Sequence, residues 1–330
     1  MTDTLDTTLD LTLDPVRLVR LTAGTVAVPG ARALLEVTGP GAVQCLQGLL
    51  TNDLVKPGDA TVTWGALLTP KGMIESDLWA LRHGESVTLI LPGRGLPAVA
   101  AAFKRALPPR LARSVDRSAE WSTLLLIGAT SEATLRESGI LRDPPAPGHL
   151  AVTANGLRIA RPAAAAPFDF ILAGPLIAVT AAAEHLARAG AAPGDADDAE
   201  AARILAGWPA LGAEIDDKTL PQEVRFDELG GVSYTKGCYL GQETVARIHF
   251  RGHPNRELRG LEWDDATPLD GRAIAGAGRD AGTVRSTLVA GGKRLGLAPI
   301  RREVQVGDEV VAGGRPARVV ALPFGDPRVA

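Results

Sequence analysis

The sequence has few of the side chains that crosslink a small protein or hold a metal ion unaided. Its two cysteines, Cys45 and Cys238, lie far apart, and neither has a C-x-x-C partner. This pattern argues against a disulfide scaffold and a self-contained zinc site, and it fits a reducing compartment. We expect Cys45, which falls inside a predicted helix, to behave as a small buried hydrophobic side chain.

Signals for export and for membrane insertion are also missing. The N-terminal segment "MTDTLDTTLDLTLD" is acidic and rich in threonine. It lacks the basic start and the apolar run of a signal peptide. No later stretch is apolar for long enough to span a bilayer. We therefore expect a cytoplasmic protein with no membrane partner.

Basic residues show no strong excess. The formal net charge is −3, and the few lysines are scattered along the chain. Such a chain offers no broad phosphate-binding face, so we expect no stable nucleic-acid binding. A local basic groove stays open as an alternative to a solvated helix face and linker, because four arginines lie close together at Arg247, Arg251, Arg256 and Arg259.

Length and composition indicate a soluble protein of several packed units. A chain of 330 residues is too long for one ordinary core, so we expect two or three units. Apolar residues make up 45% and charged residues 22%, which is ordinary for a soluble globular protein. Composition alone therefore names no function.

Hydrophobic periodicity indicates alternating strands and helices. Residues 16–28 read as short strands, and residues 61–91 alternate with period two and have two turns, which predicts an antiparallel meander. Strands and helices alternate through the rest of the first 255 residues, and helical spacing or start signals predict helices at 42–50, 96–106, 131–138, 175–189 and 195–206. This mixture predicts an α+β fold rather than a doubly wound parallel sheet.

The pattern of apolar runs and glycines changes beyond residue 256. Short β-like runs there are separated by glycine turns, which predicts a small closed β-barrel. We expect a flexible tail at 1–14, two interleaved α+β subdomains at 15–255 and a C-terminal barrel domain at 256–330.

The most informative stretch is "SYTKGCYLGQETVARIHFR", residues 233–251, which holds Cys238 and both tyrosines. Two glycines bracket the cysteine, and "QETVARIHF" predicts a helix whose first amides point back toward it. A thiol beside a cation and facing a helix N-terminus has its thiolate stabilised. Lys236 or Arg247 would supply the cation. The residues alone leave a second interpretation open, in which Cys238 is a buried core thiol and Lys236 is solvated.

The segment "KGCYLGQE" resembles the signature of the YgfZ family, folate-binding proteins related to the T protein of the glycine cleavage system. The resemblance extends to "RILAGWP", "LPQEVRFDELGGVSYTKGCYLGQETVARIHFRG", "LEVTGPGAVQCLQGLLTND" and "ALLTPKGMIESD". It implies a three-domain ring of antiparallel sheets and a C-terminal small β-barrel around a folate pocket, with the signature loop at the pocket's edge.

The resemblance also implies a set of site residues. Cys238 would be the redox-active or cluster-contacting thiol, with Lys236 beside it as the second residue of the reactive site. Tetrahydrofolate is the implied ligand, bound between the N-terminal α+β units. A pterin needs an apolar slot with a few polar groups, and its glutamate tail needs basic residues near the mouth. The expected ligand-binding residues are Tyr239, Gly241, Gln242, Glu243, Arg247 and Arg203.

The function implied by the family is assembly or repair of iron-sulfur proteins, with a link to tRNA-modifying iron-sulfur enzymes. The expected partners are folate and iron-sulfur client or carrier proteins. A [4Fe-4S] cluster usually needs four thiolates, so two lone cysteines imply no metal site of the chain's own and at most a transient contact at Cys238.

Two alternatives belong to other function classes. An aminomethyltransferase, like the T protein, would transfer a one-carbon unit to tetrahydrofolate, but that enzyme's pattern has an acid after the strand "VTLILP", where "GRGLPAVAAAFKRAL" has none. Its pterin-gripping glutamate is also missing from "RPAAAAPFDFIL". A non-catalytic folate sensor or scaffold, with a structural Cys238, is the other alternative. We favour an assembly factor over an enzyme.

Overall fold

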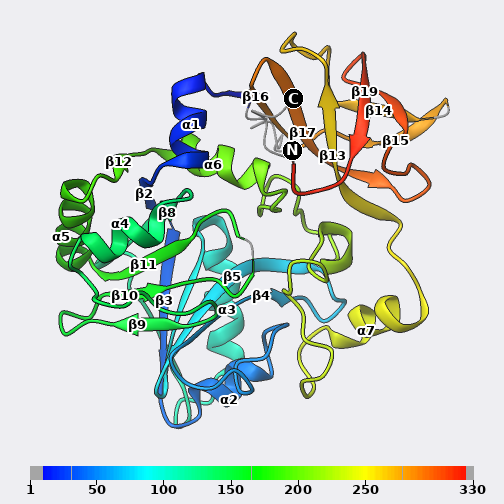
Figure 1. Ribbon diagram of the computed structural model, residues 1–330. Helices are drawn as coiled ribbons and strands as arrows, with labels where there is room; N and C mark the ends of the chain where they lie inside the picture. Colours follow the sequence, from blue (N-terminus) through cyan, green and yellow to red (C-terminus); the bar gives the residue numbers. More distant parts are fainter. Residues whose placement is uncertain (1–9, 31, 165, 277, 325–330) are drawn as a thin grey trace.

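The computed structural model describes residues 10–30, 32–164, 166–276 and 278–324. Within these residues the strands form three sheets, of five, six and eight strands. From residue 26 onward, the chain moves from the six-stranded sheet to the five-stranded sheet and back before it enters the remaining strands of the eight-stranded sheet (Figure 1). None of the described helices is long and apolar enough to cross a bilayer.

The five-stranded sheet is antiparallel, in the order β4-β5-β6-β3-β7. Its strands are β3 (Arg32–Thr38), β4 (Thr61–Leu68), β5 (Ile74–His83), β6 (Ser86–Pro92) and β7 (Arg113–Asp116). Helices α2 (Ala42–Gln47) and α3 (Leu96–Ala106) cover its outer face, and the 3-10 turn η1 (Gly93–Gly95) precedes α3. The predicted meander is confirmed.

The six-stranded sheet has the order β12-β2-β8-β11-β10-β9. Its strands are β2 (Val26–Gly30), β8 (Trp121–Ile127), β9 (Leu150–Val152), β10 (Arg158–Ala160), β11 (Phe170–Pro175) and β12 (Ala192–Pro193). Helices α4 (Ser131–Glu137) and α5 (Leu176–Arg188) pack on its outer face. Helix α6 (Ala196–Leu205) follows β12 and contributes to the central core instead.

Strand periodicity decides which side chains reach the space between these two sheets. In β5, Leu78 and Ala80 point to the helices α2 and α3, whereas Trp79 and Leu81 join the central core. Successive side chains of a strand alternate between faces, so Asp77 lies on the same inward face as Trp79. The central core is therefore built from the inner faces of both sheets, and it also receives a buried carboxyl group.

The third sheet closes on itself. It contains β1 (Asp10–Thr12), β13 (Arg256–Trp263), β14 (Ala273–Gly276), β15 (Arg279–Thr283), β16 (Ser286–Ala290), β17 (Lys293–Arg301), β18 (Glu309–Ala312) and β19 (Arg315–Val320). Six antiparallel strands, β13-β19-β18-β14-β15-β17, form a ring that the pair Gly282 and Ile300 closes. The predicted α+β fold with a C-terminal small barrel is confirmed. The division of the chain at residues 255 and 256 remains our proposal.

The N-terminal segment differs from two expectations. Residues 10–12 form β1, which pairs in parallel with β16, so the tail expected at 1–14 does not extend to them; residues 1–9 lie outside the described residues. Residues 15–23 form the helix α1 (Pro15–Ala23) instead of a strand. Asp14 accepts hydrogen bonds from the Val16 and Arg17 amides and Pro15 opens the first turn, and these start signals outweigh the strand preference of the valines.

One buried arginine joins α6 to the barrel. The Arg203 side chain donates to both carboxylate oxygens of Glu200 at 2.7 and 2.6 Å and to the Trp208 carbonyl at 2.6 Å. It also donates to Glu214 at 2.8 Å and to the hydroxyl of Ser286 in β16 at 2.7 Å. Burial alone would lower the pKa of Arg203, but Glu214 and Glu200 raise it above the ordinary value. All five N–H groups of this guanidinium are thus used inside the protein.

We predict that Arg203→Met lowers the thermal unfolding midpoint by roughly 5–15 °C, because removing one partner of a buried charge network leaves the others uncompensated. Calorimetry at pH 7 measures the change. Arg136→Met is the matched control, since Arg136 pairs with Glu132 on the exposed face of α4 and should shift the midpoint by about 1 °C or less. Equal midpoints for Arg203→Met and the wild type would contradict the proposed role.

Candidate functional site

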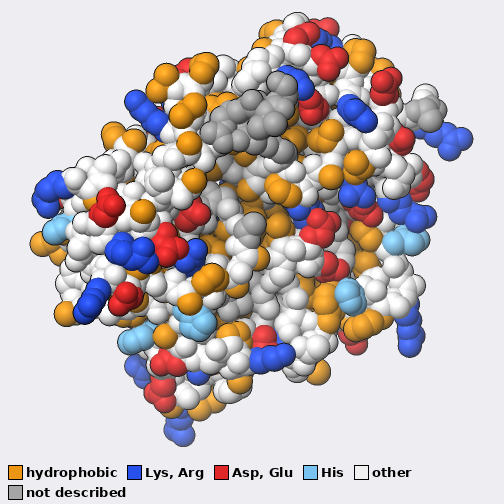
Figure 2. All heavy atoms as spheres, viewed as in Figure 1, with side chains coloured by type: hydrophobic (Ala, Val, Ile, Leu, Met, Phe, Trp, Pro, Cys, Tyr) orange, Lys and Arg blue, Asp and Glu red, His pale blue; other side chains and the backbone are white. Residues whose placement is uncertain are grey.

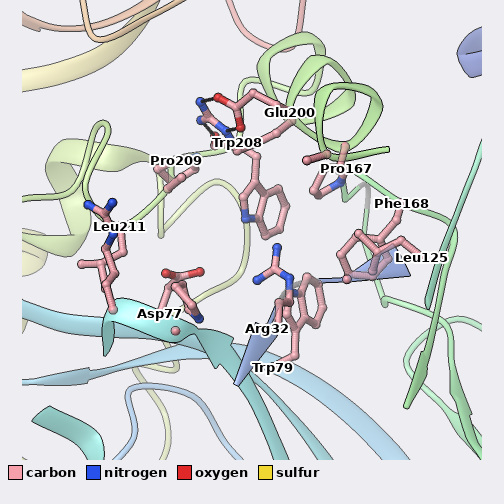
Figure 3. Close-up of a pocket in the computed structure, with 18 of the residues that line it drawn as sticks. Arg32, Asp77, Trp79, Leu125, Pro167, Phe168, Glu200, Trp208, Pro209 and Leu211 are labelled. Carbon is pink, nitrogen blue, oxygen red and sulfur yellow. Dashed lines mark hydrogen bonds and ion pairs between the residues drawn. The ribbon is translucent and has the colours of Figure 1, made fainter. Parts of the chain in front are cut away.

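The described residues enclose a cavity of about 300 Å³ between the two α+β sheets, which we call the aromatic cavity. Trp79, Phe168 and Trp208 form its walls. The Trp79 and Trp208 rings are nearly parallel with centroids 5.8 Å apart, and Phe168 meets Trp79 edge-on at 5.2 Å. Figure 3 shows Trp208 facing Trp79 and Arg32 across the cavity. Flat aromatic walls of this kind favour a flat ring as ligand.

A second cavity of about 380 Å³ adjoins the first, and we call it the loop-side cavity. Trp79 and Trp208 line both cavities. Asn52 and Ser233 line its other side, so the start of the segment 233–251 reaches this edge. In the space-filling view, hydrophobic side chains gather in the middle of the face, between the charged surfaces on the α5 side and the α7 side (Figure 2). Together the two cavities offer room for a ligand longer than one ring system.

Asp77 is the main acidic group of the aromatic cavity. Its neighbour across the sheet is Ala66, and the next inward pair along the same two strands is Trp64 and Trp79. Asp77 is 4% exposed, and its Oδ1 makes no hydrogen bond within the described residues. Burial raises the pKa of this carboxyl, with Arg32 opposing the shift. A buried acceptor without a partner is costly, so Asp77 is available to a ligand that donates hydrogen bonds.

Arg32 is the second charged group of this cavity. It comes from β3, and Figure 3 shows its guanidinium directed away from the sheet toward Trp208. Burial lowers the pKa of Arg32, and the charge of Asp77 acts in the opposite direction. The cavity therefore combines apolar walls with a few charged groups, among them Asp77 and Arg32, an arrangement typical of small-molecule sites.

Sequence reasoning missed these residues, although one signal for them was present. The strand "MIESDLWALR" places Asp77 among side chains that alternate toward a core. A carboxylate at an inward position of a buried strand is uncommon without a partner or a function. The aromatic partners Phe168 and Trp208 carry no comparable signal, because they are distant in sequence.

Lys236 does not present its charge to the cysteine side of the loop. It is 8% exposed, and its ammonium donates to the carbonyls of Leu50 at 2.8 Å and Asn52 at 2.7 Å. Burial lowers the pKa of Lys236 to about 8, partly offset by Asp53. The alternative in which Lys236 is solvated is wrong, and the contacts of Lys236 assign it to anchoring the loop.

The remaining signature residues separate into anchors and exposed positions. Tyr239 is buried, and the centre of its ring lies 5.3 Å from the Lys236 ammonium. Burial and the charge of Asp227 raise the pKa of Tyr239 to about 12. Its amide donates to the Gln242 side chain at 3.3 Å. Gly241 has φ +79°, and an added Cβ would lie 2.5 Å from the Thr69 carbonyl oxygen. Only glycine suits this close approach.

The helix expected after the signature is present as α7 (Gln242–Arg251). Glu243 and Arg247 lie exposed on it, and neither makes a hydrogen bond or an ion pair within the described residues. Cys238 is exposed too, on the loop before α7, and it is not among the residues that line the described cavities. The core-thiol alternative for Cys238 is therefore wrong. Cys45, a residue of α2, is half-buried against the core of the five-stranded sheet.

Arg203 is the one predicted ligand-binding residue that lines the aromatic cavity. All of its N–H groups are already engaged by protein acceptors, so it has none left for a ligand carboxylate. The prediction that it binds the ligand gives way to a structural role. Among the described residues, no group of three His, Cys, Asp or Glu side chains is placed to hold a metal ion.

Several known proteins resemble this chain in sequence and fold. The GCVT N-terminal domain profile matches residues 10–141. An aminomethyltransferase of Rubrobacter xylanophilus is 28% identical over 301 residues, covering 87% of this chain and 79% of that protein. A tRNA-modifying protein YgfZ of Serratia proteamaculans is 30% identical over 235 residues, covering 70% of this chain and 68% of that protein.

A solved structure shares the whole fold. The glycine cleavage system aminomethyltransferase T from Bartonella henselae superimposes with a TM-score of 0.81 at 20% identity, over 96% of this chain and 92% of that one. This likeness shows the fold, and the YgfZ relative shows the family. The chain belongs to the family that unites the YgfZ proteins with the T proteins of glycine cleavage.

Proposed function

We propose that the protein binds tetrahydrofolate between its two α+β sheets. The observation that carries this proposal is the buried Asp77 carboxyl, whose Oδ1 makes no hydrogen bond within the described residues, beside the stacked Trp79 and Trp208. A reduced pterin is a flat ring with a ring N–H and an amino group on one edge. A carboxylate accepts such an N–H pair, and aromatic walls stack on the ring. Family membership supports the same ligand.

We further propose that the folate-loaded protein assists assembly or repair of iron-sulfur proteins, through Cys238 and with a link to tRNA-modifying enzymes. The buried Lys236 and Tyr239 hold the loop in place, while Cys238 between them is exposed. A fixed loop with an accessible thiol suits a transient contact with a client or a cluster carrier. The relatives named as tRNA-modifying proteins support this assignment.

An aminomethyltransferase remains the second candidate, and Asp77 is the observation in its favour. The segment "GRGLPAVAAAFKRAL" has no carboxylate, but Asp77 supplies a buried acid with a raised pKa from another strand. Such a group is suited to proton transfer at a bound ligand. Formation of methylenetetrahydrofolate from an aminomethylated carrier protein separates the candidates: the assembly factor gives none, and the transferase gives it in a manner that depends on Asp77.

Tetrahydrofolate affinity should depend on pH through Asp77. The N–H pair of the ligand binds the ionised carboxylate, so affinity rises as pH increases through the pKa of Asp77, which lies above 3.8. Asp77→Asn should weaken binding by roughly 10–100-fold at pH 7 and flatten this dependence. Anaerobic calorimetric titrations from pH 5 to 8 measure both. The exposed Asp143→Asn is the control and should bind like the wild type; unchanged affinity in Asp77→Asn would remove Asp77 from the site.

Cys238 should matter for client enzymes and not for the ligand. We expect Cys238→Ser to keep the wild-type tetrahydrofolate affinity, since the residue does not line the cavities, while iron-sulfur enzyme activities fall to the level of cells without the protein. The matched control is Cys45→Ser, which should support those enzymes. If cells with Cys238→Ser keep wild-type iron-sulfur enzyme activities, the proposed role of the thiol is wrong, and a folate sensor or scaffold is favoured.

Lys236 should give a characteristic pH dependence of stability. The pKa of Lys236 is about 8 in the folded protein against the ordinary lysine value of 10.5, so the unfolded chain binds more protons between these pH values. Stability from this group therefore rises with pH from about 8 to 10.5. The difference in thermal midpoint, wild type minus Lys236→Met, should grow over this interval. A constant difference would show that Lys236 is not held as described, and Lys104→Met on exposed α3 serves as control.

A further inference from the structure

A third cavity of about 450 Å³ adjoins the aromatic cavity, and we call it the outer cavity. Arg94 and Leu211 line both of them. Arg94 belongs to the short η1 turn after β6, so its backbone is fixed between a buried strand and the start of α3. Its side chain therefore lies at the junction of the two cavities.

The backbone of Gly212 makes room for the Arg94 guanidinium. An added Cβ at Gly212 would lie 1.5 Å from Nη1 of Arg94 and 2.3 Å from its Cζ. Any side chain at position 212 would therefore displace the guanidinium from its place at the junction of the two cavities. The φ of +88° at Gly212 also favours glycine.

Arg94 makes no hydrogen bond or ion pair within the described residues. Arg32 of the aromatic cavity makes none either, but it lies under the charge of Asp77. Arg203 is saturated by protein acceptors, and Arg285 lies 3.5 Å from Asp216. A guanidinium presents a planar set of N–H donors that matches a carboxylate. Arg94 is thus the cation that is free to receive an anionic group at this point.

The surroundings limit where that anion binds. Glu75, Asp216 and Asp217 line the outer cavity, so its far side disfavours a second negative group. Glu200 of the aromatic cavity is engaged by Arg203. A ligand carboxylate is therefore favoured at the junction itself, against Arg94, and not deep in either cavity.

We infer that Arg94 is the carboxylate receptor of the site. Resting on the proposed function, the ligand lies with its ring against the aromatic walls at Asp77, and a carboxylate of its glutamate tail meets Arg94 at the junction. The ligand thus has a donor-rich end at a buried acid and an anionic end at an unpaired base. This polarity fixes the direction in which it lies.

Two probes test this assignment by anaerobic calorimetry with the full chain. Tetrahydrofolate has the ring and the tail, whereas 6-methyltetrahydropterin has the ring and no carboxylate. Arg94→Gln should weaken tetrahydrofolate binding about tenfold, because charge-assisted hydrogen bonds are lost, and should leave the affinity for 6-methyltetrahydropterin unchanged. Arg94→Lys keeps the charge and loses the planar set of donors, so its tetrahydrofolate affinity should lie between those of the wild type and Arg94→Gln.

Salt gives an independent readout. The affinity of the wild type for tetrahydrofolate should fall between 50 and 500 mM salt, because a tenfold rise in ionic strength shortens the screening length about threefold, and this dependence should be absent in Arg94→Gln. The exposed Arg110→Gln is the matched control and should retain wild-type affinity and salt dependence.

The outcomes separate this inference from the function on which it rests. If neither probe binds the wild type, the proposed folate function fails. If both probes bind and Arg94→Gln leaves tetrahydrofolate affinity unchanged, the function stands and the assignment of Arg94 is wrong. Equal weakening of both probes by Arg94→Gln would likewise overturn it, since the variant would then affect the ring site and not the tail.

Discussion

The buried guanidinium of Arg203 is the interaction on which the arrangement of this molecule depends. It ties α6 to the loop that carries Trp208 and Glu214, and it reaches Ser286 of the barrel sheet. Breaking such a network leaves buried charges without partners, which is far more costly than losing an exposed ion pair. The position of Trp208, and with it one wall of the aromatic cavity, follows from this constraint.

The proposed ligand cavity and the exposed thiol lie in different parts of the molecule. The inner faces of the sheets supply an aromatic cavity with one unpaired acid, while the loop before α7 exposes a thiol outside it. Lys236 connects the two regions, because its ammonium is bonded to the carbonyls of Leu50 and Asn52, and Asn52 lines the loop-side cavity. Ligand binding at the cavity therefore has a short structural route to the loop, and this is how a folate-dependent thiol function would be organised.

The helices and strands could be predicted from local sequence signals. The site could not, because it depends on contacts between residues that are far apart in the chain. The helix at 96–106 and the start of α7 at Gln242 follow from periodicity and glycine punctuation and are confirmed. Lys236 was expected to supply a cation beside Cys238, and its role as an anchor could not be predicted because its acceptors lie 186 and 184 residues earlier in the chain. Arg203 was predicted to bind the ligand, and its structural role could not be predicted because its partner Ser286 comes from another sheet. Among these residues, only Asp77 could have been identified from the sequence, because it is a carboxylate at an inward position of a strand.

The most direct test of the account is fluorine NMR of the protein labelled with 5-fluorotryptophan, titrated anaerobically with tetrahydrofolate. The chain has five tryptophans, and single Trp→Phe variants assign their signals. The account predicts that the resonances of Trp79 and Trp208 shift on binding, while that of Trp263, which is buried inside the barrel, stays in place. Saturation of the protein without a shift at Trp79 and Trp208 would contradict it.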